Sequence, residues 1–209
     1  MEAKAWRKLL GHEKEQLRWC TIIVGAHRVT EDDDVEAAVA AAVQSVLDWR
    51  DEWRAAGRAG LLSGAIWRGA FEVEVMRDLG AHKSSLVSAL GCQAANLLPG
   101  ERIIIPHVHF VVAHRHVADL KEKLANRWHG PRQTVCKRLY AHQTVPEALT
   151  KLYSYTHKRR FQYSEGGING AEDEAVKFTD PLENHWRRLV DMIYRELDEL
   201  EVSIFRSKA

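Results

Sequence analysis

The sequence lacks the long hydrophobic segments of a membrane protein. No stretch approaches the roughly 18 uninterrupted apolar residues that a membrane-spanning helix requires. The first residues, MEAKAWRKLLGHEKEQ, carry too many charges for a secretory signal peptide. The chain of 209 residues is nevertheless long enough to bury one large core. We therefore expect a soluble, cytoplasmic protein that makes no membrane contact.

Cysteine is also scarce. The three cysteines, Cys20, Cys92 and Cys136, lie far apart and form no C-x-x-C pair. An odd number of dispersed cysteines is not typical of a disulfide framework, and a zinc knuckle needs closely paired cysteines. We expect all three to be core cysteines, without a disulfide framework.

The chain has almost no net charge, +1 at pH 7, but its charges are unevenly distributed. Between Val111 and Tyr163 there are eleven lysines and arginines and only three acidic residues. The compensating acidic residues lie elsewhere, in EDDD at Glu31–Asp34 and near the C-terminus. A basic segment in a neutral chain favours a polyanion bound on one surface, although a solvated helix face gives the same pattern.

Hydrophobic periodicity predicts an α+β protein. A short N-terminal helix precedes a strand near Cys20–His27, and a helix runs from an N-cap at Asp34 to Gly57. The later expected elements are a strand at FEVEV (71–75), an insertion with a short helix (77–102), a strand at 103–114, a helix at 117–128, a strand at 133–140, a helix at 146–161, a polar loop at 164–175 and a C-terminal amphipathic helix at 180–205. Their order predicts a ferredoxin-like, RRM-like antiparallel sheet with helices packed on it.

The strand at 103–114, IIIPHVHFVVAH, carries two imidazoles at its centre. Side chains two residues apart in a strand point to one face, so His107 and His109 would stand together, which suits a metal ion. Mg²⁺ or Mn²⁺ also prefers carboxylate oxygen, which Glu72 or Glu74 could supply from the FEVEV strand. Glu72 is preferred, but sequence does not fix the register that decides between them. Alternatively, both histidines are buried polar residues without a metal, since H-x-H often occurs by chance.

A second group of candidate residues lies in LYSYTHKRR, on the helix expected at 146–161. Tyr155 and Lys158 are three residues apart and share a helical face, whereas Tyr153 points elsewhere. A phenol with a pKa of about 10 needs help to attack phosphorus, and the Lys158 ammonium would favour phenolate or neutralise charge on the phosphoryl oxygens. The metal would polarise the same phosphate from the other side. Alternatively, both tyrosines are packing aromatics.

In chain order these segments resemble the HUH endonuclease superfamily, and within it the single-tyrosine replication initiators (Rep) of rolling-circle plasmids and viruses. The resemblance rests on TIIVGAH, FEVEV, PHVHF and YTHK and covers roughly Cys20–Phe161. The chain departs from the family's compact pattern by the insertion before the histidines. The resemblance implies that His107, His109 and either Glu72 or Glu74 bind Mn²⁺ or Mg²⁺. It implies that Tyr155 is the nucleophile and that Lys158 assists it, with Tyr153 as the reserve nucleophile.

The implied reaction is nicking and religation of single-stranded DNA at a replication origin. The tyrosine would attack a phosphodiester, form a 5′-phosphotyrosine bond and release a 3′-hydroxyl that primes synthesis. Residues 1–165 would form the nicking domain, and residues 166–209 a loop and a helix that packs on it or makes an oligomer contact. Candidate partners besides DNA are a host helicase, a polymerase and a second copy of the chain; the chain itself has no G-x-x-x-x-G-K-[ST] loop of a helicase. The candidate DNA-binding residues are Arg115, Lys137, Arg138, Arg159 and Arg160.

Three alternatives stay open from the sequence. A transposase or relaxase of the same superfamily would use the same residues, although conjugative relaxases usually place the tyrosine before the histidines. A non-covalent metal-dependent hydrolase would need the histidines and a glutamate, but not Tyr155. A DNA-binding regulator would have the same fold but no catalytic activity. A histidine-triad nucleotide hydrolase is set aside, because its motif needs a third histidine where this chain has Val111.

Overall fold

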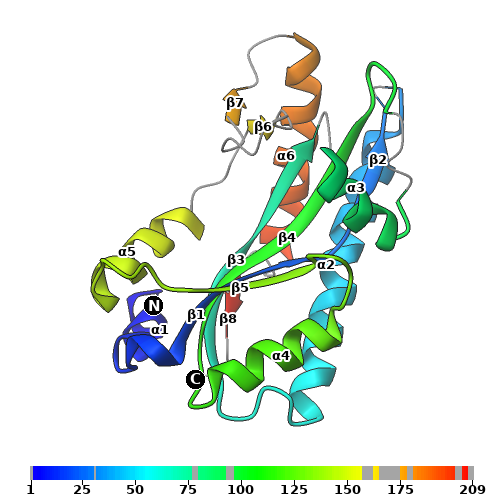
Figure 1. The fold of residues 1–209 in the computed structure, drawn as a ribbon. Coiled ribbons are helices and arrows are strands. Elements are labelled where there is room, and N and C mark those ends of the chain that lie inside the picture. Colours follow the sequence, from blue (N-terminus) through cyan, green and yellow to red (C-terminus); the bar gives the residue numbers. More distant parts are fainter. Residues whose placement is uncertain are drawn as a thin grey trace.

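The computed structural model has an α+β fold, which confirms the predicted fold class (Figure 1). A mainly antiparallel sheet carries helices on both faces. Within the described ranges, every helix is too short or too polar to span a membrane. The structure describes residues 2–30, 32–76, 80–92, 97–156, 162–164, 175–177, 181–200 and 204–206.

Strands and helices are interspersed along the described parts of the chain, and strands follow one another directly in two places. The strands are β1 (Leu17–Ile23), β2 (His27–Val29), β3 (Ile66–Met76), β4 (Arg102–Ala113), β5 (Thr134–Arg138), β6 (Gln162–Ser164), β7 (Ala175–Lys177) and β8 (Ile204–Arg206). The α-helices are α1 (Glu2–Leu10), α2 (Val35–Arg58), α3 (Gly80–Ala89), α4 (Val117–Arg127), α5 (Val145–Thr156) and α6 (Pro181–Glu199).

The two longest strands, β3 and β4, form the centre of the sheet. Neighbouring strands follow the order β5-β1-β4-β3-β6-β7, with β2 paired to β4 and β8 paired to β3. β3 and β4 are antiparallel over the whole of β3, from Ile66 opposite Ala113 to Met76 opposite Ile103. This order adds β2, β6, β7 and β8 to the expected strands, and the ferredoxin-like assignment stays a prediction.

Two of the expected elements have wrong boundaries. The first strand ends at Ile23, and the chain resumes pairing as a separate strand, β2. Between them Gly25 lies so close to α2 that a Cβ there would be 2.6 Å from Ser45 Oγ, so the chain turns where a side chain would not fit. At the other end α6 stops at Glu199, and Ile204, expected on its apolar stripe, lies in β8 beside β3 instead. The edge of β3 offers backbone hydrogen bonds to this segment, which helical periodicity cannot anticipate.

One face of the sheet packs against α2, α4 and α6 and forms the main hydrophobic core. Trp49 and Trp53 lie one turn apart on α2 and therefore point to the same side. Trp53 stacks on Trp128 with ring centroids 5.4 Å apart, and Trp49 meets Phe71 of β3 edge-on. Large aromatic rings bury more apolar area than other side chains, so this cluster anchors the helices on the sheet.

The C-terminal helix α6 contributes to the same core. Its buried residues Trp186, Ile193 and Leu197 recur at helical spacing, as the sequence predicted. The Tyr194 hydroxyl accepts a hydrogen bond of 3.1 Å from the Val73 N–H. Val73 lies in the part of β3 between the residues that pair with β6 and those that pair with β8. The helix thus packs directly on the sheet and on α2 (Figure 1).

The opposite face of the sheet carries two smaller hydrophobic clusters. α1 and α5 cover the first, which contains Val111 and Ala113 of β4. α3 covers the second, which contains Ile103 and Ile105 of the same strand. The stretch of β4 between these clusters carries its two histidines on this face, because alternate residues of a strand share a side.

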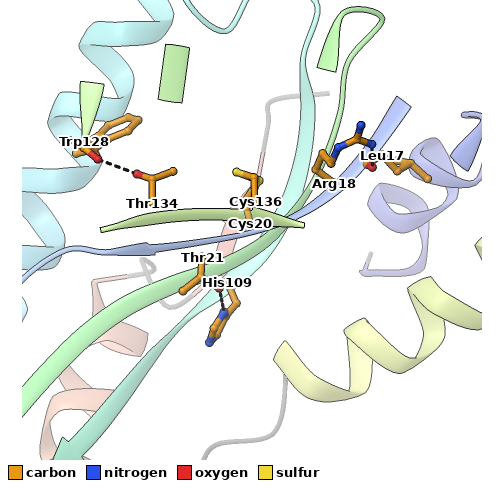
Figure 2. The surroundings of a disulfide bond; sticks show 8 residues. All are labelled: Leu17, Arg18, Cys20, Thr21, His109, Trp128, Thr134 and Cys136. Carbon is orange, nitrogen blue, oxygen red and sulfur yellow. Dashed lines mark hydrogen bonds between the residues drawn. A yellow bond between two sulfur atoms is a disulfide. The ribbon is translucent and has the colours of Figure 1, made fainter. Parts of the chain in front are cut away.

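The expectation that the cysteines lie in the core holds for Cys20, and Cys136 packs against the same core, but the two are not free thiols as expected. Cys20 of β1 and Cys136 of β5 lie directly opposite each other and form a disulfide bond (Figure 2). Their separation of 116 residues conceals that the two strands are neighbours in the sheet. Cys92 is buried with a free thiol, as expected.

Replacing Gly69 by alanine should destabilise the fold strongly. A Cβ at this position of β3 would lie 1.9 Å from the His109 carbonyl oxygen and 2.5 Å from Phe110 Cβ, so β3 and β4 would have to separate. We expect a loss of about 3 kcal/mol or more in the free energy of unfolding, measured by urea denaturation. Gly57→Ala is the matched control: its nearest contact is 3.7 Å away, and in α2 alanine should stabilise by about 0.5–1 kcal/mol. Equal effects of the two substitutions would contradict the close approach of the strands.

Candidate metal centre

Three polar side chains meet on the sheet face that lies between the two smaller clusters. Glu72 of β3 is directly opposite His107 of β4, and His109 is flanked by Ala70 of β3 and Thr21 of β1. The exposed fractions are only 9% for Glu72, 4% for His107 and 9% for His109. Buried ionisable groups require partners, so this grouping needs a chemical explanation.

The distances among the three side chains match those around a small divalent cation. The two imidazole Nε2 atoms are 3.0 Å apart, and Glu72 Oε2 is 3.2 Å from His109 Nε2 and 3.7 Å from His107 Nε2. Octahedral ligands at about 2.1 Å from an ion are separated by about 3 Å from their neighbours. The three atoms therefore resemble one face of a coordination shell, and this group could hold a metal ion.

Hydrogen bonds on the far side of each ring orient the imidazoles. His107 Nδ1 lies 3.1 Å from the Ile105 carbonyl oxygen, which can only accept, so Nδ1 carries the proton and Nε2 of the neutral ring carries the lone pair. His109 Nδ1 lies 2.7 Å from Thr21 Oγ1, and the Trp19 ring stacks on the other side of His109 at 5.2 Å. Such outer contacts fix the ring of a metal-binding histidine and direct its free nitrogen to the ion.

The electrostatics of the group call for a positive charge at its centre. Burial alone would raise the pKa of Glu72, but the two adjacent imidazoles, of which a protonated one places its positive charge beside the carboxylate, outweigh burial and hold that pKa well below its usual range. For His107, burial would lower the pKa, yet the adjacent negative charge of Glu72, with the charge of Glu74, gives a net rise. Two Nε2 lone pairs and a carboxylate repel one another unless a proton or a cation lies among them. A metal bound to this group would displace a proton, so its affinity would rise with pH through the raised pKa of His107.

The strand register brings Glu72, and not Glu74, to the imidazoles. Glu74 lies opposite Ile105, two residues further along β3 on the same face, and is half-buried. The charge of Glu74 helps to raise the pKa of His107, but Glu74 is not one of the three residues of the group. The preference for Glu72 agrees with this placement.

The tyrosine and lysine candidates are only partly described. Tyr153 is half-buried and meets Trp6 of α1 edge-on, with ring centroids 5.6 Å apart. Tyr155 belongs to α5, but its side chain lies outside the described part of the chain. Lys158, Arg159 and Arg160 follow the end of α5 and also lie outside the described residues. The role of Tyr155 as nucleophile therefore stays a prediction.

The position of α5 can still be stated from its described residues. Ala148, Leu149 and Leu152 pack on Val111 and Ala113 of β4, which share the sheet face of His109. Val111 is the next residue of β4 on that face after His109, and residues two apart in a strand are about 7 Å from each other. α5 thus covers the same face as the three polar side chains, beside them.

Of the predicted DNA-binding residues, Arg115, Lys137 and Arg138 are exposed. Lys137 and Arg138 lie on the edge strand β5, and Arg115 follows β4. Sequence reasoning missed Trp19 and Thr21, because only the pairing of β1 with β4 places them at His109. A threonine within an apolar strand was the one available signal.

If the group of three holds a divalent cation, Glu72→Gln should weaken that binding strongly, with Mn²⁺ as the probe. The amide keeps the shape of the side chain but removes the negative charge that offsets a cation, so we expect affinity to fall at least about 100-fold, measured by calorimetric titration. Glu74→Gln is the control, and its effect should be smaller than about 10-fold, because Glu74 lies outside the group of three and its charge acts on His107 from the neighbouring position of β3. A larger effect of Glu74→Gln than of Glu72→Gln would reverse the assignment of the carboxylate ligand.

Comparison of the chain with protein-family models, with curated proteins and with solved structures gives no match. The evidence on function therefore comes from the chain's own chemistry. The main observation is the group formed by the imidazoles of His107 and His109 and the carboxylate of Glu72 on neighbouring strands.

Proposed function

We propose that this protein is a metal-dependent endonuclease that nicks single-stranded DNA through a tyrosine, as replication initiators of the HUH superfamily do. The observation that carries the proposal is the convergence of His107, His109 and Glu72, from the PHVHF and FEVEV segments, on one buried point. The two motifs that made the sequence resemble that superfamily are thus neighbours in space. Three protein ligands leave further coordination positions for water and a phosphate oxygen.

Mn²⁺ or Mg²⁺ is the cation that we propose for this group. Glu72 supplies a hard oxygen ligand, and the two imidazoles favour a cation of borderline character, so Mn²⁺ fits the set best and Mg²⁺ is the second candidate. The cation, when bound, polarises the scissile phosphate and offsets the negative charge of the transition state.

The residues of the chain would then carry out a transesterification. The Tyr155 oxygen attacks phosphorus and loses its proton, the bond between phosphorus and the 3′-oxygen breaks, and the released 3′-oxygen takes up a proton. The product is a 5′-phosphotyrosine, and attack by the 3′-hydroxyl reverses the step and religates the strand. Lys158 is proposed to favour the phenolate. The position of α5 beside the metal group supports this assignment, because α5 carries Tyr155.

A basic strand edge next to the site supports a polyanionic substrate. Lys137 of β5 is paired with Trp19, the residue that stacks on His109, so its charge lies near the metal group on the same face. On the other face Arg138 lies directly opposite Arg18. Burial is the largest cause that lowers the pKa of Arg18, and the positive charge of Arg138 is the second. Like charges placed opposite each other in a sheet are unfavourable, and a bound phosphate group relieves that repulsion.

A non-covalent hydrolase is the second candidate, and one observation favours it. The group of Glu72, His107 and His109 is complete without any tyrosine, and a water molecule activated there would suffice for hydrolysis. A transposase or relaxase would use the same residues as the replication initiator and differs from it in its DNA partner.

Incubation with single-stranded DNA and Mn²⁺ should give a covalent adduct that survives denaturing electrophoresis. The probe is a pool of oligonucleotides of randomised sequence, labelled in separate samples at the 3′ or the 5′ end. A 5′-phosphotyrosine transfers only the 3′ label to the protein, because the protein retains the downstream fragment. Tyr155→Phe should abolish the transfer, whereas the control Tyr153→Phe should retain it, because Tyr153 packs against Trp6.

Each other outcome of this experiment has its own meaning. An adduct that persists in Tyr155→Phe and disappears in Tyr153→Phe makes Tyr153 the nucleophile. Cleavage without any adduct identifies the hydrolase. Binding without cleavage identifies a DNA-binding regulator and contradicts the proposed enzyme.

The double substitution Lys137→Ala, Arg138→Ala should weaken binding of single-stranded DNA and reduce its salt dependence. Each lost phosphate contact lowers the slope of log affinity against log salt concentration by about 0.7, so the slope should fall by about 1.4, measured by fluorescence anisotropy. Arg54→Ala is the control, because Arg54 on α2 pairs with Asp51. An unchanged slope in the double variant would remove β5 from the DNA-binding surface.

A further inference from the structure

The disulfide bond is formed by Cys20, the residue between the two that contact the His109 ring. Cys20 sits between Trp19 and Thr21 in β1, and both of these contact the His109 ring, by stacking at 5.2 Å and by a hydrogen bond of 2.7 Å to Nδ1. Because side chains of a strand alternate, Cys20 points to the opposite face and there bonds to Cys136 of β5 (Figure 2). The covalent bond and the contacts to the imidazole therefore share three consecutive residues.

The strand on the other side of the bond, β5, lies at the edge of the sheet. β5 has five residues, most of its side chains are exposed, and β1 is its only partner among the described strands. The facing charges of Arg18 and Arg138 oppose the pairing. A short edge strand with little buried area opens at low cost in free energy, so the disulfide fixes the β1–β5 pairing.

We propose that the Cys20–Cys136 bond is a redox-sensitive brace of the metal centre. In the oxidised protein β5 is fixed to β1, and Trp19 and Thr21 are held against His109. In the reduced protein the edge strand opens more often, the two contacts loosen, and His109 is less well oriented as a ligand. The inference rests on the metal centre of the proposed function and adds that the redox state of the two cysteines regulates it.

The chemistry is a thiol–disulfide exchange with a small thiol of the glutathione class as reductant. The thiolate is proposed to attack Cys136 Sγ, because Cys136 is the partly exposed residue of the pair whereas Cys20 is fully buried. This step forms a mixed disulfide and releases the Cys20 thiolate, which takes up a proton. A second thiol then attacks the mixed disulfide, which leaves Cys136 as a thiol and the two small thiols joined as a disulfide. Two electrons pass from the small thiols to the cysteines.

The test compares the Mn²⁺ affinity of the oxidised and the reduced full-length protein. The protein is reduced with dithiothreitol, desalted without oxygen and titrated with Mn²⁺ by calorimetry, and thiol labelling verifies the state of the cysteines. We expect reduction to weaken Mn²⁺ binding about 10-fold, the effect of losing an outer contact to a ligand. Cys136→Ser and Cys136→Val, which cannot form the bond, should have the affinity of the reduced protein under both conditions.

Two controls separate this coupling from a general loss of stability. Cys92→Ala should keep the full difference between the oxidised and reduced states, because Cys92 has no part in the bond. Thr21→Val should weaken Mn²⁺ binding in the oxidised state and shrink the redox difference, because it removes the hydroxyl that contacts His109. A purely structural disulfide would change the melting temperature on reduction and leave the Mn²⁺ affinity unchanged.

The outcomes distinguish this inference from the proposed function. Tight Mn²⁺ binding with equal affinity in both redox states overturns the brace and leaves the metal centre in place. No Mn²⁺ binding in either state overturns the metal centre, and the inference with it. A full redox difference in Thr21→Val overturns the route through His109.

Discussion

Side chains of β3 and β4 alternate between two faces that are both covered by helices, so the register of these strands decides which groups meet in the interior. With Glu72 opposite His107, the carboxylate and both imidazoles share one face, while Phe71 and Val108 join the tryptophan-rich core on the other. A slip of one residue would put the carboxylate into that apolar core. The hydrophobic core and the polar group therefore select the same register.

Burial gives the polar group its chemical character. Two imidazole lone pairs and an ionised carboxylate, all acceptors, repel one another at distances near 3 Å away from water, and the opposite pKa shifts of Glu72 and His107 express the need for a positive charge among them. A proton can satisfy that need in the isolated protein, and a divalent cation satisfies it with more ligand contacts. The same feature that makes the group costly to bury makes it a candidate site for a cation.

The strand β1 connects this centre to the edge of the sheet. On one face Trp19 and Thr21 hold His109, and on the other Cys20 is bonded to Cys136 of β5. The exposed cations of β5 lie on the same short strand. Two neighbouring strands, β1 and β5, thus carry the residues that orient His109, the disulfide bond and exposed positive charges. We therefore expect changes in β5 to affect the group of Glu72, His107 and His109.

The sequence by itself determined the α+β class, most of the helices and strands, and the pairing of His107 with His109 on one face, because these depend on local periodicity. It left Glu72 and Glu74 as alternatives, and only the register of β3 on β4 placed Glu72 opposite His107. It also missed the Cys20–Cys136 bond, the contacts of Thr21 and Trp19, and the change from helix to strand before Ile204. All of these depend on which distant segments become neighbours, and that is decided by the packing of the whole chain rather than by the residues next to one another.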